Sequence, residues 1–141
     1  MDNFIIRESN KSESEQVINE IINYNLSKVP KTQEDDFIYI NRVILNSDGK
    51  IIAGINSKMY CWNCLYIDVL WINEDYRKQG LGSILLKEVE NASKEKGCYL
   101  IHLDTFDFQA KDFYIKNGYK VFGTLDECPK GHKRYFMSKV I

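Results

Sequence analysis

Residues Glu74–Glu88 read EDYRKQGLGSILLKE, and this stretch decides the fold. Gly80 and Gly82 stand one residue apart, Arg77 and Lys78 precede them, and an amphipathic run follows. A helix that begins here would present unpaired backbone N–H groups and a partial positive charge at its start. Glycines let phosphate oxygens approach such a backbone without a side chain in between. The stretch therefore predicts an anion site, and we expect the anion to be a pyrophosphate.

The elements on either side of this turn support that prediction. Residues 64–72, CLYIDVLWI, are apolar on both faces, which is typical of a strand in the middle of a sheet. Residues 80–97 predict the clearest helix of the chain, with Gly97 as its C-terminal stop. Its apolar stripe consists of Leu81, Ile84, Leu85, Val89 and Ala92.

Hydrophobic periodicity and turn residues place the other elements. Residues 12–26 have helical spacing, with Ser12 and Glu15 as a capping box, and Asp48-Gly49 indicates a hairpin turn. The predicted order is a strand at 4–8, a helix at 12–26, a loop or short helix at 29–36, strands at 37–45, 51–59 and 64–72, the helix at 80–97, a strand at 98–105, a helix at 108–118, and strands at 119–125 and 132–140.

Size and charge limit the classes of function. The 141 residues suit a single domain, 1–141, with a sizeable core. A net charge of −1 disfavours non-specific binding to nucleic acid or to an anionic membrane. No apolar run approaches the roughly 20 residues of a membrane span, and the N-terminus does not resemble a signal peptide. We therefore expect no nucleic-acid or membrane partner and a cytoplasmic location.

The four cysteines include one close pair, Cys61 and Cys64, in the sequence CWNC. A zinc site would need two further ligands, and neither Cys98, Cys128 nor the two histidines form a second close pair. We therefore expect no metal and interpret the cysteines as structural thiols. A zinc-stabilised interaction domain built on CWNC remains an alternative.

The spacing of the glycine turn narrows the choice of anion. A dinucleotide fingerprint would place glycine or alanine where Leu85 stands, although Asp104 lies at a suitable distance for the ribose carboxylate. A P-loop would need Lys and Ser or Thr after the second glycine, and these are absent. A nicotinamide-nucleotide enzyme is therefore a distant alternative.

Two motifs carry a resemblance to a known family. INEDYRKQGLG resembles the acyl-CoA-binding signature R/Q-x-x-G-x-G/A of the GNAT (N-acetyltransferase) superfamily, here with Arg77, Gly80 and Gly82. FYIKNGYKVFG, which starts at Phe113, is similar to that family's F-Y-x-K-x-G-F/Y helix end. The element order also matches along nearly the whole chain. The resemblance implies an α/β (α+β-type) acyl-CoA N-acyltransferase fold: a central mixed sheet of about seven strands flanked by about four helices, with a V-shaped splay between the strands 64–72 and 98–104.

The resemblance also implies a set of site residues. Acetyl-CoA would lie in the splay, with its pantetheine arm along the strand that carries Leu70 and Ile72. Tyr114 would be a general acid near the thioester sulfur. The pyrophosphate would lie at the turn formed by Arg77, Lys78, Gln79, Gly80, Leu81, Gly82 and Ser83.

The chain departs from the family pattern at two positions. Glu74 stands where a proline is frequent, which changes only the turn. Asp107 stands where many members have asparagine, three residues before Ala110. We expect Asp107 and Ala110 to lie where the helix start meets the pantetheine.

Candidates for the base and for the acceptor site are less specific. Asp68 lies mid-strand, with Tyr66 and Leu70 expected on its face, and a carboxylate in an apolar strand needs a role or a partner. His102 is a second candidate base. The predicted acceptor-binding residues are Glu34, Asp35, Asp36, Trp71 and Asp104.

The combined prediction is an acetyl-CoA-dependent N-acetyltransferase. Tyr114 would be the general acid and Asp68 the general base, in a direct attack by a small-molecule or peptide amine. A non-catalytic acyl-CoA sensor with the same fold is the main alternative. Dimers are common in the family, and this sequence does not itself show one.

Overall fold

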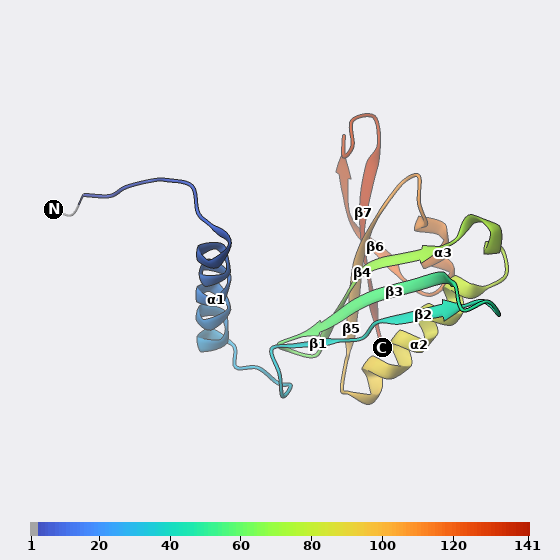
Figure 1. Cartoon of the computed structure of the whole chain (residues 1–141), viewed down its shortest axis with the longest axis horizontal. Coiled ribbons are helices and arrows are strands. Elements are labelled where there is room, and N and C mark those ends of the chain that lie inside the picture. The colour runs from blue at the N-terminus through green and yellow to red at the C-terminus, as the bar shows by residue number, and fades with distance from the viewer. Residues whose placement is uncertain (1–2) are drawn as a thin grey trace. The chain divides into compact units, whose positions relative to one another are not determined.

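The computed structural model describes residues 3–141 and divides into two compact units (Figure 1). The first unit ends at Lys31, and the second spans Thr32–Ile141.

The first unit contains one helix, α1 (Lys11–Lys28). Its capping box consists of Asn10 and Glu13: the Asn10 side chain accepts from the Glu13 backbone N–H at 2.8 Å, and the Glu13 carboxylate accepts from that of Asn10 at 3.1 Å. The predicted cap at Ser12 and Glu15 is wrong by two residues. The strand predicted at 4–8 is also absent, because a strand needs a partner for its backbone hydrogen bonds and this unit has none.

The second unit is built on a mixed sheet of seven strands: β1 (Phe37–Tyr39), β2 (Arg42–Leu45), β3 (Ile51–Tyr60), β4 (Cys64–Ile72), β5 (Leu100–Phe106), β6 (Lys120–Asp126) and β7 (Lys133–Val140). Their order is β1-β3-β4-β5-β7-β6, with β2 also on β3. Only β4 and β5 are parallel; all other neighbours are antiparallel. The predicted mixed sheet of about seven strands is confirmed.

The strand predicted at 37–45 is interrupted and forms both β1 and β2. They pair with successive parts of β3, β1 at Lys58–Tyr60 and β2 at Ile51–Ile55. At the break, the Asn41 side chain accepts a hydrogen bond from the Ser57 backbone N–H at 2.9 Å. A side chain thus replaces one rung of the ladder. Because one predicted strand forms two, the number of strands is still seven although the strand predicted at 4–8 is absent.

The second unit contains two α-helices, α2 (Leu81–Glu95) and α3 (Lys111–Lys116), and a short 3-10 turn, Glu74–Tyr76. With α1 the described chain has three α-helices, one fewer than expected. Figure 1 shows α2 alongside β2, β3 and β4, with which it packs. No helix of residues 3–141 is long and apolar enough to cross a membrane.

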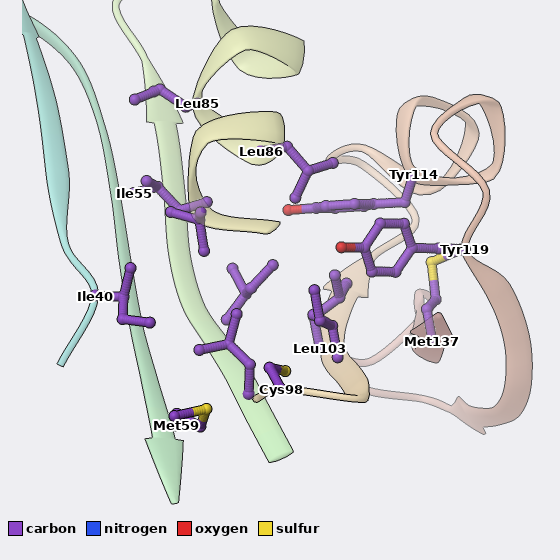
Figure 2. Close-up of a cluster of buried hydrophobic side chains, with 14 of the residues drawn as sticks. Ile40, Ile55, Met59, Leu85, Leu86, Cys98, Leu103, Tyr114, Tyr119 and Met137 are labelled. Atoms are coloured by element: carbon purple, nitrogen blue, oxygen red, sulfur yellow. The ribbon is translucent and has the colours of Figure 1, made fainter. Parts of the chain in front are cut away.

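The core lies between α2, α3 and one face of the sheet. Leu86 and Val89 of α2 are almost fully buried, as are Ile55 of β3 and Ile101 of β5. Figure 2 shows Leu86 next to the ring of Tyr114, with Tyr119 beside it; the two tyrosine rings meet edge-on, with centroids 5.7 Å apart. Leu86 of α2 and Tyr114 of α3 thus belong to one core beside the strands that open to form the site.

Candidate active site and cofactor cleft

The strands β4 and β5 separate in the middle of the sheet. They pair from Cys64 opposite Leu100 to Ile67 opposite Leu103, and no further. Beyond that point β4 stays with β3 and β5 stays with β7, so each strand follows its other neighbour. The predicted V-shaped splay is confirmed, and it leaves backbone groups of β4 without a strand partner on this side.

A β-bulge lies on β4 where the splay begins. Asn56 pairs with Val69 and Ser57 with Ile67, so Asp68 is the extra residue. A bulge bends the strand and turns the extra side chain in a new direction. The prediction that Asp68 shares a face with Tyr66 and Leu70 is therefore wrong. Leu70 instead packs against the core, and the Asp68 side chain is exposed.

The glycine turn leads directly into α2. Gly80 has φ of 77° and Lys78 has φ of 63°, so both residues are in the left-handed region. No side chain caps α2, and its first turn contains no acidic residue. The N–H groups that precede the first helical hydrogen bond, from Ile84 to the Gly80 carbonyl, therefore face outward without a side-chain acceptor. This is the arrangement that an anion requires.

A cavity of about 290 Å³ lies beside this turn. Of the twelve residues predicted to bind the cofactor, only Gln79 and Asp107 are absent from its lining. The cavity also contacts Tyr76 and Phe113, which were not predicted. Its lining consists of Leu70, Ile72, Tyr76, Arg77, Lys78, Gly80, Leu81, Gly82, Ser83, Ala110, Phe113 and Tyr114.

A larger cavity of about 510 Å³ occupies the splay itself. Asp68 and Trp71 line it from β4, Asp104 lines it from β5, and Phe108 lines it from the loop after β5. The two cavities have five lining residues in common: Leu70, Ile72, Arg77, Ala110 and Tyr114.

Tyr114 lines both cavities at this junction. Its side chain is only 6% exposed, and its hydroxyl makes no hydrogen bond to any residue of the described chain. Burial, and secondarily the negative charge of Asp104, raise the pKa of Tyr114 to about 12. The hydroxyl therefore keeps its proton at neutral pH, and that proton is available to a bound group.

Asp104 is held by two neighbours across the sheet. Arg134 of β7 donates to its Oδ1 from two nitrogens at 2.9 and 2.6 Å, and the Tyr66 hydroxyl donates to Oδ2 at 2.8 Å. Burial, and then the hydrogen bond to Asp104, raise the pKa of Tyr66 to about 12. Asp104 thus reaches the larger cavity, as predicted, as one half of an ion pair.

His102 lies deeper along β5. Its Nε2 and the Tyr60 hydroxyl are 2.6 Å apart, and burial lowers its pKa. It lines neither cavity, so the structure does not bring this second candidate base to the site.

Five other predicted residues also lie outside the two cavities: Gln79 in the glycine turn, three acidic residues before β1, and Asp107. Glu34, Asp35 and Asp36 belong to the loop before β1. Asp107 accepts hydrogen bonds from the Lys133 backbone N–H at 2.9 Å and from His132 Nδ1 at 2.8 Å. The hydrogen bond from the Lys133 backbone N–H is the main cause of the lowered pKa of Asp107. Asp107 therefore ties the β5–α3 loop to the β6–β7 hairpin.

Phe108 was missed by sequence reasoning. The run Phe106-Asp107-Phe108 directly after a strand was a signal that could have found it, because exposed aromatics at strand ends often line sites. Cys61 and Cys64 lie at the turn between β3 and β4, as expected. Within residues 3–141, no group of three or more His, Cys, Asp or Glu side chains is placed to hold a metal ion.

Comparisons with known proteins agree with this geometry. The model of the acetyltransferase (GNAT) family matches residues 6–119. The blasticidin-S acetyltransferase of Streptomyces morookaense is 34% identical over 92 residues, which cover 64% of this chain and 67% of that protein.

Solved structures give the same result. An acetyltransferase from Bacillus cereus is 40% identical and superposes with a TM-score of 0.90 over 98% of both chains. A streptothricin acetyltransferase from Bacillus anthracis, solved with acetyl coenzyme A, is similar in fold: its TM-score is 0.64, with 24% identity over 73% of this chain and 62% of that one. The family match, the splayed strands and the uncapped glycine turn lead to one conclusion: the chain belongs to the GNAT acetyltransferase family.

Proposed function

We propose that the protein is an acetyl-CoA-dependent N-acetyltransferase that acts on a primary amine, with Tyr114 as its general acid. The observation that carries the proposal is that Tyr114 lines two adjoining cavities, one beside the uncapped start of α2 and the other in the splay. The smaller cavity suits the phosphates of a cofactor. The larger cavity would share its β4 side with the pantetheine arm and leaves room for a second substrate.

The cofactor end is formed by backbone as much as by side chains. The N–H groups of Leu81, Gly82 and Ser83 would hold the pyrophosphate, with Arg77 and Lys78 adding positive charge. The unpaired backbone of β4 beyond Ile67 would bind the pantetheine amides as an additional strand. When bound, acetyl-CoA supplies an acetyl group as a thioester, whose carbon–sulfur bond breaks as a carbon–nitrogen bond to the acceptor forms.

Tyr114 would supply the proton that the departing sulfur takes. The lining of both cavities by Tyr114 supports a role for its hydroxyl between the two substrates. The raised pKa of Tyr114 keeps the proton on Oη until the departing sulfur takes it. The tyrosinate that results would recover a proton from solvent.

Asp68 is proposed as the group that takes the proton of the incoming ammonium. It is the extra residue of the β4 bulge, lines the larger cavity and forms no hydrogen bond or ion pair with another described residue. Asp104, by contrast, has both oxygens engaged. The acceptor is proposed to be a small-molecule amine, which the similarity to an antibiotic acetyltransferase supports.

Thermal unfolding with and without saturating acetyl-CoA, with NAD as the control, tests the cofactor. A ligand at 100 times its dissociation constant adds about 2.7 kcal/mol, which is a shift on the order of 5–10 °C for a domain of this size. A shift with acetyl-CoA alone is expected, and no shift with acetyl-CoA would overturn the proposal.

The Tyr114→Phe variant tests the chemistry, with Tyr39→Phe as a matched control on exposed β1. Tyr114→Phe should retain the acetyl-CoA shift and lower kcat about 100-fold or more, while Tyr39→Phe leaves both unchanged. CoA release measured by chromatography is the readout. An unchanged kcat in Tyr114→Phe would remove Tyr114 from the mechanism. An acetyl-CoA shift without turnover of any amine would favour a sensor instead.

A further inference from the structure

The larger cavity has an aromatic lining, which acetylation of an amine does not by itself require. Two large aromatic side chains line it from its two sides: Trp71 from β4 is 45% exposed, and Phe108 from the β5–α3 loop is 59% exposed. Both rings therefore offer apolar surface to whatever enters the cavity.

Phe108 is held firmly despite its exposure. Its ring stacks on Phe106 with centroids 5.2 Å apart and planes 6° apart, and the His132 ring meets it edge-on at 5.2 Å. His132 is in turn bound to Asp107, whose second oxygen accepts from the Lys133 backbone. Phe106 and His132 each cover part of the Phe108 ring, and the exposed remainder of the ring is left for a ligand.

The charge of the cavity is also specific. Asp104 is neutralised by Arg134, whereas Asp68 has no ion-pair partner among the described residues. Arg77 lines both cavities and would be engaged by the phosphates of a bound cofactor. With a cofactor in place, the acceptor would therefore meet one negative charge between two aromatic surfaces. Aromatic faces attract both flat rings and cations.

We propose that the acceptor is a primary amine attached through a short linker to a flat aromatic or heteroaromatic ring. Asp68 receives the ammonium group, while Phe108 and Trp71 hold the ring. This inference rests on the proposed function, because it concerns the second substrate of the same site. It makes Phe108 a specificity-determining residue.

Two amines of the same length and charge separate the ring effect from size. The wild-type protein, with saturating acetyl-CoA, should acetylate 2-phenylethylamine with a kcat/KM about tenfold above that for 2-cyclohexylethylamine, since aromatic contacts add to burial of apolar area. Phe108→Leu should reduce this ratio to about one. Phe122→Leu, an exposed phenylalanine on β6 that lines neither cavity, is the matched control and should keep the tenfold preference.

The outcomes distinguish this inference from the proposed function. Equal use of the two amines by the wild type, or an unchanged ratio in Phe108→Leu, overturns the inference and leaves the acetyltransferase intact. Binding of acetyl-CoA, seen as a thermal shift, without acetylation of either amine overturns the inference too. Absence of that shift overturns the proposed function itself. Loss of the preference in Phe108→Leu alone, with the acetyl-CoA shift retained, supports the inference.

Discussion

Gly80 and Gly82 are required for two different physical reasons. Gly80 has φ of 77°, and a Cβ there would meet no atom within 4 Å, so its requirement is the left-handed backbone. A Cβ on Gly82 would lie 3.2 Å from the Phe113 ring tip, so its requirement is close packing of α2 on α3. The motif indicated that both glycines matter. Only the packing of α3 shows that Phe113 is the neighbour that leaves no room for a side chain at Gly82.

Gly82→Val should abolish the acetyl-CoA thermal shift and lower the free energy of unfolding by about 1–3 kcal/mol, because the side chain overpacks against Phe113. Denaturant unfolding with and without acetyl-CoA measures both effects. The double variant Gly82→Ala with Phe113→Leu provides the control, since a smaller side chain at 113 makes room. Retained acetyl-CoA binding in Gly82→Val would contradict the assignment of this turn to the cofactor.

At the scale of elements, Asp68 has two separate effects: its carboxylate is the proposed base, and its place in the β4 bulge sets the register of the strand. Strict alternation placed Asp68 on the same face as Leu70, which was wrong, because one extra residue shifts every later side chain to the opposite face. The alternation of apolar residues along a strand does not reveal a bulge when both faces are largely apolar. Register with β3 is what determines it.

Asp68→Asn and deletion of Asp68 should therefore behave differently. Asp68→Asn keeps the bulge, so the unfolding midpoint should change by less than about 2 °C while kcat/KM falls about 100-fold through loss of the base. The deletion removes the extra residue, so Val69 stays opposite Asn56 and Leu70 stays opposite Ile55 in a regular register. Leu70 and Ile72 then keep the core face, so the fold should persist while the bend at the splay is lost together with the base. Thermal unfolding measures the stability of both variants, and steady-state kinetics measures their kcat/KM. Wild-type kcat/KM in Asp68→Asn would show that Asp68 is not the base.

At the scale of the whole molecule, two buried tyrosines link stability to pH. Burial raises the pKa of Tyr114 to about 12, and burial with the nearby Glu90 raises the pKa of Tyr119. The Tyr119 hydroxyl donates to Glu90 at 2.9 Å, which adds to the effect. Because the folded pKa values exceed the unfolded value of about 10, their stabilisation is full below pH 10 and is lost as the pH rises above it.

We expect the free energy of unfolding to fall between pH 9 and pH 11, by about 1.4 kcal/mol at pH 11 for Tyr114 alone. Urea denaturation at both pH values measures this loss. Tyr114→Phe has no ionisable group at this position, so its loss should be smaller by that amount. An equal loss in the variant and the wild type would contradict the burial of this hydroxyl.

Three predictions about the whole chain remain untested: its domain count, its oligomeric state and its location. The chain divides into two compact units, and a single domain over 1–141 stays a prediction, as do the homodimer and the cytoplasmic location. The helix predicted at 12–26 is present as α1, and its apolar residues Val17, Ile18 and Ile21 are exposed.

Sequence by itself determined the features that depend on neighbours along the chain. The presence of three helices, the glycine turn, the hairpin at Asp48-Gly49 and the family motifs follow from local sequence, and they identified nearly all of the smaller cavity. Only the tertiary structure decided the bulge at Asp68, the pairing of Asp104 with Arg134, and the presence of Trp71 and Phe108 in the lining of one cavity. These depend on which distant strands pair and in what register, because contacts between segments far apart in sequence form only when the whole sheet closes its core.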